Sequence, residues 1–69
     1  NNTKYLEWCL DTIEPEVLLN HQIKAIEMNF LKELNLFDEI EIHQQKNKNG
    51  ILFRIQHQDK INFLCNLEL

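Results

Sequence analysis

The side chains that could carry nucleophilic, acid–base or metal chemistry are the 11 acidic residues, three histidines and two cysteines. The histidines and cysteines are His21, His43, His57, Cys9 and Cys65. The histidines lie in polar contexts without the mutual spacing of metal ligands and with no nucleophile nearby, so we expect neither a metal site nor a catalytic triad. The sequence contains no serine and a single glycine, Gly50, which argues against a serine hydrolase and a glycine-rich phosphate-binding loop. We expect no cofactor.

The bulk composition describes one small acidic domain. The chain has 69 residues and a formal net charge of −4, so it holds one domain at most, with a core of marginal stability. Scattered lysines in an acidic chain do not suit nucleic acid, whose phosphates require clustered positive charge. Cys9 and Cys65 are too few for a disulfide framework, and their apolar neighbours indicate buried thiols in a reducing compartment. No apolar run reaches the ~18 residues of a membrane span, so we expect a soluble cytoplasmic protein.

An amphipathic helix is predicted over residues 4–13. Its apolar face carries Tyr5, Leu6, Cys9, Leu10 and Ile13, and its opposite face is charged. Trp8 lies at the edge of the apolar stripe. Asn2 or Thr3 can cap the helix N-terminus. Pro15 then breaks the chain and begins a second, short helical turn that Asn20 ends.

From His21 onward the apolar period changes to two, which is typical of strands. A long strand is predicted over residues 21–34, and a change of parity within it predicts a bulge or bend near Ala25. A turn follows at residues 35–38. Three further strands are predicted around residues 39–43, 51–56 and 61–69, joined by a hairpin turn at Asn49-Gly50 and a short link near Gln58-Asp59.

These elements indicate an α+β fold with one helix against an antiparallel sheet. Short links between the last strands require antiparallel pairing, and the apolar face of the sheet should carry the helix. A central helix packed on a curved antiparallel sheet of about four strands describes the later part of a hotdog fold. The strand that should lead into the helix is missing from the sequence, so we predict an incomplete hotdog.

Two blocks of the sequence resemble acyl-[acyl-carrier-protein] thioesterases. The run Asn-Asn-Thr-Lys-Tyr-Leu-Glu-Trp at residues 1–8 resembles the segment that opens the central helix in the family's C-terminal hotdog half. Residues 21–33 resemble the family's strand pattern, in which an aromatic residue, two further residues and Glu close a long strand. The resemblance covers residues 1 to about 42. It departs at Phe37, where the family usually has Gly before the Asp of the turn.

The resemblance implies hydrolysis of a fatty acyl thioester by water, with release of free fatty acid in fatty acid biosynthesis. By position Glu33 matches the family's strand-terminal Glu, proposed to act near the reactive His and water; the alternative is a solvated Glu. Asn1 and Asn2 would shape an oxyanion pocket where the helix offers unpaired N–H groups and the positive end of its dipole, or Asn2 would simply cap the helix. Tyr5 and Trp8 would line an acyl pocket, or belong to the core.

The resemblance also implies that other parts are needed. The family's reactive Asn and His, with a nearby Asp, stand just before the Asn-Asn pair, so we expect residues 1–69 to form a partial C-terminal hotdog domain that is inactive alone. A second hotdog, in the same chain or as a homodimer partner, is implied. An acidic carrier protein would meet a basic rim, for which Lys4, Lys24 and Lys32 are candidates. Two alternatives stay open: a single-hotdog acyl-coenzyme A thioesterase, and a non-catalytic hotdog remnant that dimerises or binds lipid.

Overall fold

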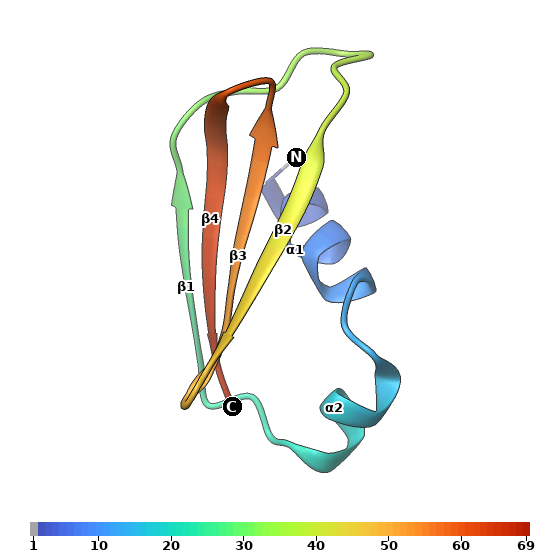
Figure 1. Cartoon of the computed structure of the whole chain (residues 1–69), viewed down its shortest axis with the longest axis vertical. Helices are drawn as coiled ribbons and strands as arrows, with labels where there is room; N and C mark the ends of the chain where they lie inside the picture. Colours follow the sequence, from blue (N-terminus) through green and yellow to red (C-terminus); the bar gives the residue numbers. More distant parts are fainter. Residues whose placement is uncertain (1) are drawn as a thin grey trace.

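Two helices precede four strands in the chain. The computed structural model describes residues 2–69, with side chains from residue 3 onward. The elements are α1 (Asn2–Asp11), α2 (Pro15–Asn20), β1 (Ala25–Phe30), β2 (Glu41–Asn47), β3 (Gly50–His57) and β4 (Lys60–Glu68). Helix α1 lies across one face of the sheet, and α2 follows near its lower end (Figure 1). Neither helix between residues 2 and 69 has the length and apolar character that crossing a membrane requires.

The four strands form one open antiparallel sheet in the order β1-β4-β3-β2. Strands β2, β3 and β4 form the predicted meander, because two-residue turns at positions 48–49 and 58–59 join them. Strand β1 pairs with the other side of β4, from Ala25 opposite Glu68 to Phe30 opposite Phe63. Strands β1 and β2 are therefore the edges of the sheet in the described part of the chain. This α+β arrangement confirms the predicted fold class and is compatible with an incomplete hotdog.

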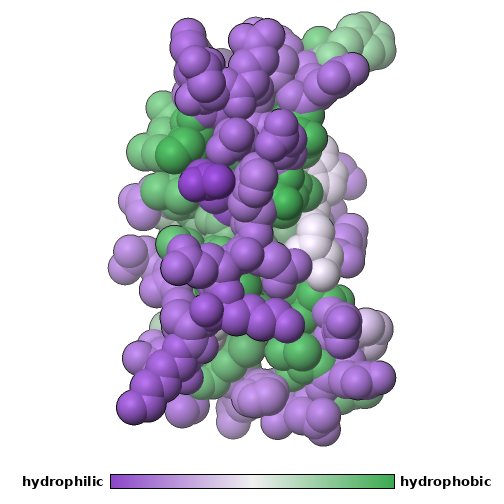
Figure 2. Space-filling view, in the orientation of Figure 1, coloured by the Kyte–Doolittle hydropathy of each residue, from purple (hydrophilic) through white to green (hydrophobic). Residues whose placement is uncertain are grey.

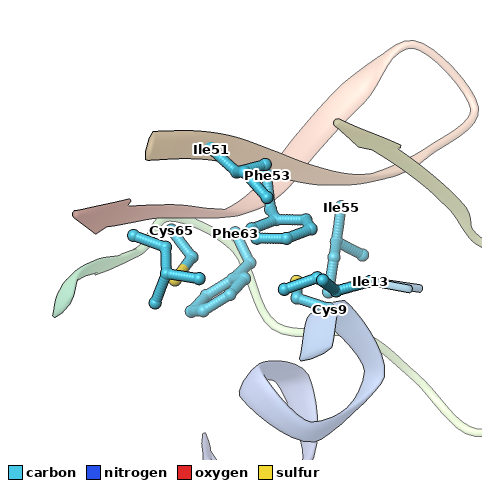
Figure 3. Close-up of a cluster of buried hydrophobic side chains, with 8 residues drawn as sticks. Cys9, Ile13, Ile51, Phe53, Ile55, Phe63 and Cys65 are labelled. Carbon is cyan, nitrogen blue, oxygen red and sulfur yellow. The ribbon is translucent and has the colours of Figure 1, made fainter. Parts of the chain in front are cut away.

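The core lies between α1 and the central strands β3 and β4. Its buried residues are Cys9, Ile13, Ile51, Phe53, Ile55, Phe63, Cys65 and Leu67. The alternation predicted for β3 is confirmed, since its odd-numbered residues face inward and its even-numbered residues are partly exposed. Figure 3 shows these side chains gathered between the two strands and the helix. Burial of these groups removes apolar surface from water and holds α1 against the sheet.

The two cysteines are free thiols within this core. Burial, and to a smaller extent the charge of Cys65, raises the pKa of the Cys9 thiol to about 12. Burial also raises the pKa of the Cys65 thiol. Both groups therefore stay neutral near pH 7 and act as small hydrophobes, as predicted.

Both helices correspond to predicted elements, with shifted bounds. Helix α1 already includes Asn2 and Thr3, the two predicted caps, and ends at Asp11. The Thr12 hydroxyl then donates a hydrogen bond of 2.7 Å to the Cys9 carbonyl and helps to end the helix. Helix α2 begins at Pro15, as predicted from the fixed φ of proline.

The strand predicted over residues 21–34 is wrong at both ends. Strand β1 spans only Ala25–Phe30, and its pairing with β4 is continuous, so the parity change near Ala25 marks the start of the strand and no bulge. The irregularity of the sheet lies elsewhere. In the β3–β4 ladder Ile55 faces Phe63 and Gln56 faces Ile61, which leaves Asn62 as an extra residue.

The hairpin between β2 and β3 confirms the predicted turn but gives its glycine another role. Positions 48 and 49 form the turn, and Gly50 is already the first residue of β3, without a positive φ. A Cβ atom at Gly50 would collide with the backbone carbonyl of Leu67 on β4. Glycine is therefore required here because two backbones approach each other closely.

The predicted turn at residues 35–38 is present, and it strains one residue. The Asp38 N–H donates to the Asn35 carbonyl over 3.1 Å, and the Asn35 N–H donates to the Asp38 carboxylate over 2.8 Å. Between them Phe37 adopts φ of 71°. Phe37 is 91% exposed, so no buried contact of its ring compensates for this conformation. This left-handed conformation costs a non-glycine residue about 1–2 kcal/mol, and it occurs where the resembling family usually has Gly.

Candidate active site

Glu33 lies at the end of the sheet where β1 ends and the β3–β4 turn begins. It helps to line a cavity of about 120 Å³ whose other walls are Lys32, Asn35, Asp38, His57, Gln58, Lys60 and Asn62. The Glu33 side chain is exposed and forms no ion pair or hydrogen bond with the residues that the structure describes. Its carboxylate is therefore free to accept hydrogen bonds from water or from a group brought in by another part of the protein.

Tyr5 connects helix α1 to the residue after Glu33. The Leu34 N–H donates a hydrogen bond of 3.3 Å to the Tyr5 hydroxyl. The Tyr5 ring meets the edge of Phe63 at 5.5 Å between centroids and stacks on Trp8 at 5.6 Å. These contacts fix the ring between the helix and the sheet. The first half of α1 and Glu33 therefore lie at the same end of the molecule.

Asn62 holds the backbone immediately before Glu33. Its side-chain amide donates a hydrogen bond of 3.2 Å to the Lys32 carbonyl, and its side-chain oxygen accepts one of 3.0 Å from the His57 N–H. The Asn62 residue is only 3% exposed. A buried amide costs free energy unless its polar atoms are paired, and here both are.

His57 closes the cavity from β3. One ring nitrogen, Nδ1, lies 2.6 Å from the Glu39 carbonyl oxygen, and the other, Nε2, lies 3.6 Å from an oxygen of the Asp38 carboxylate. The ring therefore lies between the Glu39 carbonyl and the Asp38 carboxylate. The His57 side chain is 28% exposed and contacts both Asp38 and Glu39.

The cavity lining carries charges of both signs, with Lys32 and Lys60 beside the carboxylates of Glu33 and Asp38. Lys32 and Lys60 lie close enough that a hydrogen bond from Lys60, and then repulsion between the two ammonium groups, lower the pKa of Lys32. Neither forms an ion pair with an acidic side chain among residues 3–69. By contrast, Lys4 is paired with Glu7 at 3.4 Å, and Lys24 lies at the opposite end of β1 from Lys32. The three predicted rim lysines therefore do not form one rim.

Three of the five predicted site residues have side chains in the described part of the structure. Tyr5 and Glu33 are brought together through Leu34, and Trp8 stacks behind Tyr5. Tyr5 and Trp8 are both partly buried against the core, which is the alternative stated from the sequence, so their contact with an acyl chain stays a prediction. Asn1 and the side chain of Asn2 lie outside the described part of the structure, and so do their predicted contacts.

Sequence reasoning missed Asn62, Asp38 and His57 as neighbours of Glu33. Asn62 and His57 follow Glu33 by more than twenty residues in the sequence, and no local pattern marks them. The bulge that gives Asn62 its place leaves Ile61 39% exposed, against the alternation that predicts it on the apolar face. The Asn35–Asp38 turn could be predicted, but not the contact of its carboxylate with His57.

The arrangement can hold and polarise water but offers no nucleophile of its own. The two thiols lie in the core with raised pKa values. Within residues 3–69 no group of three His, Cys, Asp or Glu side chains is placed to hold a metal ion. A free carboxylate beside two ammonium groups can orient a water molecule or a histidine supplied from outside these residues.

Comparison with known proteins identifies the family. No curated protein and no solved structure matches the chain significantly. A family model described as the acyl-ACP thioesterase C-terminal domain, where ACP is the acyl carrier protein, matches residues 1–67. The match includes both helices, strands β1 to β3, all but the last residue of β4, and the cavity, so it extends well past residue 42, where the resemblance in the sequence ends. The chain belongs to the acyl-ACP thioesterase C-terminal domain family.

Proposed function

We propose that this chain is the C-terminal hotdog domain of an enzyme that hydrolyses the fatty acyl thioester on acyl carrier protein and releases a free fatty acid. Family membership supports thioesterase activity, a hydrolase activity of fatty acid biosynthesis, for full-length members in general. The observation that carries the finer proposal is the 3.3 Å hydrogen bond between the Leu34 N–H and the Tyr5 hydroxyl. This bond brings the first turns of α1 beside Glu33, the two features that the proposed chemistry uses together.

In the proposed reaction water attacks the thioester carbonyl carbon. Glu33 orients the attacking water or the reactive histidine, which the family resemblance places upstream of Asn1. The developing oxyanion is stabilised at the N-terminus of α1, with Asn1 and Asn2 beside it, because unpaired N–H groups and the helix dipole favour negative charge there. The carbon–sulfur bond then breaks, the carrier thiol leaves with a proton, and the fatty acid is released. Tyr5 and Trp8 form part of the wall of the acyl pocket.

A second hotdog domain, in the same chain or as a homodimer partner, covers the edge at β1 in this proposal. Ile26, Met28 and Phe30 lie on the same side of β1 and are 41%, 42% and 43% exposed. Hydrophobic side chains also reach the surface along the flank where β1 lies (Figure 2). Edge strands with exposed apolar residues pair readily with another strand. Pairing here would satisfy the free backbone groups of β1 and bury all three side chains.

The carrier protein approaches the cavity end of the domain. Lys32 and Lys60 supply positive charge there without acidic partners among residues 3–69, and charge complementarity of this kind steers acidic proteins. The proposal includes a cytoplasmic location, which the free thiols of Cys9 and Cys65 suit. A coenzyme A thioester would require several positive groups for its phosphates. Lys32 and Lys60 are only two such groups, which supports the carrier protein as the substrate carrier in this proposal.

The direct test is hydrolysis by the full-length protein of acyl-ACP and acyl-coenzyme A substrates over a panel of chain lengths. We expect faster turnover of acyl-ACP, and a Glu33→Gln variant that folds normally but is slower by about 10²–10⁴-fold, the usual contribution of a positioned acid–base group. Glu16→Gln, an exposed carboxylate on α2, is the matched control and should keep full activity. An unchanged rate in Glu33→Gln would remove Glu33 from the mechanism. Preference for acyl-coenzyme A would favour a single-hotdog acyl-coenzyme A thioesterase. No hydrolysis at all would favour a non-catalytic hotdog remnant.

A further inference from the structure

Asn62 is a buried polar residue placed by a defect in the sheet. The extra residue in β4 interrupts the β3–β4 ladder between the Ile55–Phe63 and Gln56–Ile61 pairs, and Asn62 is that residue. A bulge of this kind redirects a side chain that a regular strand would point elsewhere. Asn62 is consequently 3% exposed, at the end of the sheet that carries Glu33.

The hydrogen bonds of Asn62 that reach beyond the β3–β4 hairpin go to the two residues before Glu33. The Asn62 carbonyl accepts from the Leu31 N–H at 2.9 Å and from the Lys32 N–H at 3.2 Å. Its side-chain amide donates to the Lys32 carbonyl at 3.2 Å. Both backbone polar groups of Lys32 are thus held by one residue of β4.

The other side of Glu33 is also held. The Leu34 N–H donates to the Tyr5 hydroxyl over 3.3 Å. The peptide groups on both sides of Glu33 are therefore fixed, by Asn62 from the sheet and by Tyr5 from α1. The Glu33 side chain itself has no hydrogen-bond partner among the described residues, so its direction depends on this backbone.

From this geometry we propose that Asn62 is a positioning residue for Glu33, acting together with Tyr5. The proposal rests on the function proposed above, in which Glu33 orients water or histidine. In this role Asn62 acts through the backbone: it fixes the peptide group before Glu33 and thereby the position from which the carboxylate projects. A purely structural Asn62 would instead stabilise the domain without any specific link to Glu33.

A double-mutant cycle in the full-length protein separates these two roles. Asn62→Asp keeps the size of the side chain and the acceptor for the His57 N–H, but removes the donor to the Lys32 carbonyl. Since small misplacements of a reacting group cost up to about 10²-fold, we expect kcat to fall about 10–100-fold with little change in KM. In the Glu33→Gln background the same change should cost less than about threefold, because coupled residues are not additive.

Two further variants keep the test decisive. Tyr5→Phe removes the acceptor for the Leu34 N–H while it keeps the ring, and should show the same dependence on Glu33; it carries the test if Asn62→Asp does not fold. Gln56→Ala is the control, since the side-chain amide of Gln56 donates to the Gln58 carbonyl in the β3–β4 turn and forms no hydrogen bond with Lys32, Glu33 or Leu34 in the described part of the chain. It should leave kcat unchanged in both backgrounds.

The outcomes distinguish the two proposals. If Glu33→Gln slows hydrolysis but Asn62→Asp costs the same factor with and without Glu33, the positioning role is refuted and the proposed function stands. Full kcat in Asn62→Asp or in Tyr5→Phe also refutes the positioning role. If Glu33→Gln hydrolyses acyl-ACP at the normal rate, the assigned role of Glu33 fails first, and the role of Asn62 fails with it.

Discussion

Replacing Phe37 with glycine should stabilise the chain, although it removes a large apolar side chain. Phe37 holds φ of 71° and its side chain is 91% exposed, so the ring contributes little buried surface to the folded state. Relief of the left-handed strain is worth about 1–2 kcal/mol. The extra freedom of glycine in the unfolded chain costs about 0.4–1 kcal/mol. The difference predicts a gain of up to about 1.6 kcal/mol, with a central value of about 0.8 kcal/mol, in the free energy of unfolding.

Urea unfolding followed by circular dichroism measures this gain directly. The midpoint temperature of thermal unfolding, Tm, should rise by about 4–8 °C for each kcal/mol gained in a domain of this size. Two neighbouring variants test the reason. Phe37→Ala removes the ring but keeps the Cβ atom that causes the strain, so its stability should stay close to that of the parent. Leu36→Gly removes a side chain that is 84% exposed at a position without positive φ, and should lower stability by about 0.5–1 kcal/mol. Equal losses in the two glycine variants would refute the reasoning.

Three other perturbations follow from the fold. Gly50→Ala should destabilise the domain by about 1–3 kcal/mol or more, measured by urea unfolding, because its Cβ atom would strike the Leu67 carbonyl; wild-type stability would contradict the close approach. Because burial raises the pKa of Cys9 from 9.0 to about 12, the stability due to the neutral thiol is complete below pH 9 and is lost as the pH rises towards 12. A thiol reagent at pH 8 should therefore react with Cys9 and Cys65 only as fast as the chain opens, and immediate labelling would contradict their burial. Met28→Lys, at a side chain that is 42% exposed, should leave the fold intact but weaken association with a second hotdog domain, measured by sedimentation; unchanged association would place the interface elsewhere.

The element types could be predicted because local patterns determine them. The alternation of Ile51, Phe53 and Ile55 indicates a half-buried strand, and the fixed φ of Pro15 indicates the start of a helix. The order of β2, β3 and β4 followed from the short turns between them, which leave only antiparallel neighbours. The place of β1 beside β4 did not follow from the sequence. The length of β1 could not be predicted in this way. Residues on both sides of it share the period of two. Pairing with β4 ends at Glu68, the last residue of β4, on one side and at Phe63, next to the extra residue Asn62, on the other.

The candidate site could be predicted only where the family resemblance reached. Glu33 and Tyr5 follow from matched motifs, and their neighbourhood depends on one tertiary hydrogen bond that no pattern encodes. The place of Asn62 depends on a single extra residue in β4, which changes the direction of a side chain without changing the composition of the strand. His57 was dismissed because its sequence neighbours are polar. Its partners, Asp38 and Glu39, come from a segment that is distant in the sequence and close only after the sheet forms.

The edges of the sheet differ in a way that limits how large an assembly can grow. Strand β2 carries charged and amide side chains with one apolar residue, Ile42, and charged edges resist adventitious pairing. Strand β1 has three apolar side chains on one side. A domain with one edge strand able to pair can bind a single partner through its sheet, whereas two such edges would allow domains to add on indefinitely and form fibres. If β1 pairs with a second hotdog domain as proposed, growth through these strands stops at a closed pair.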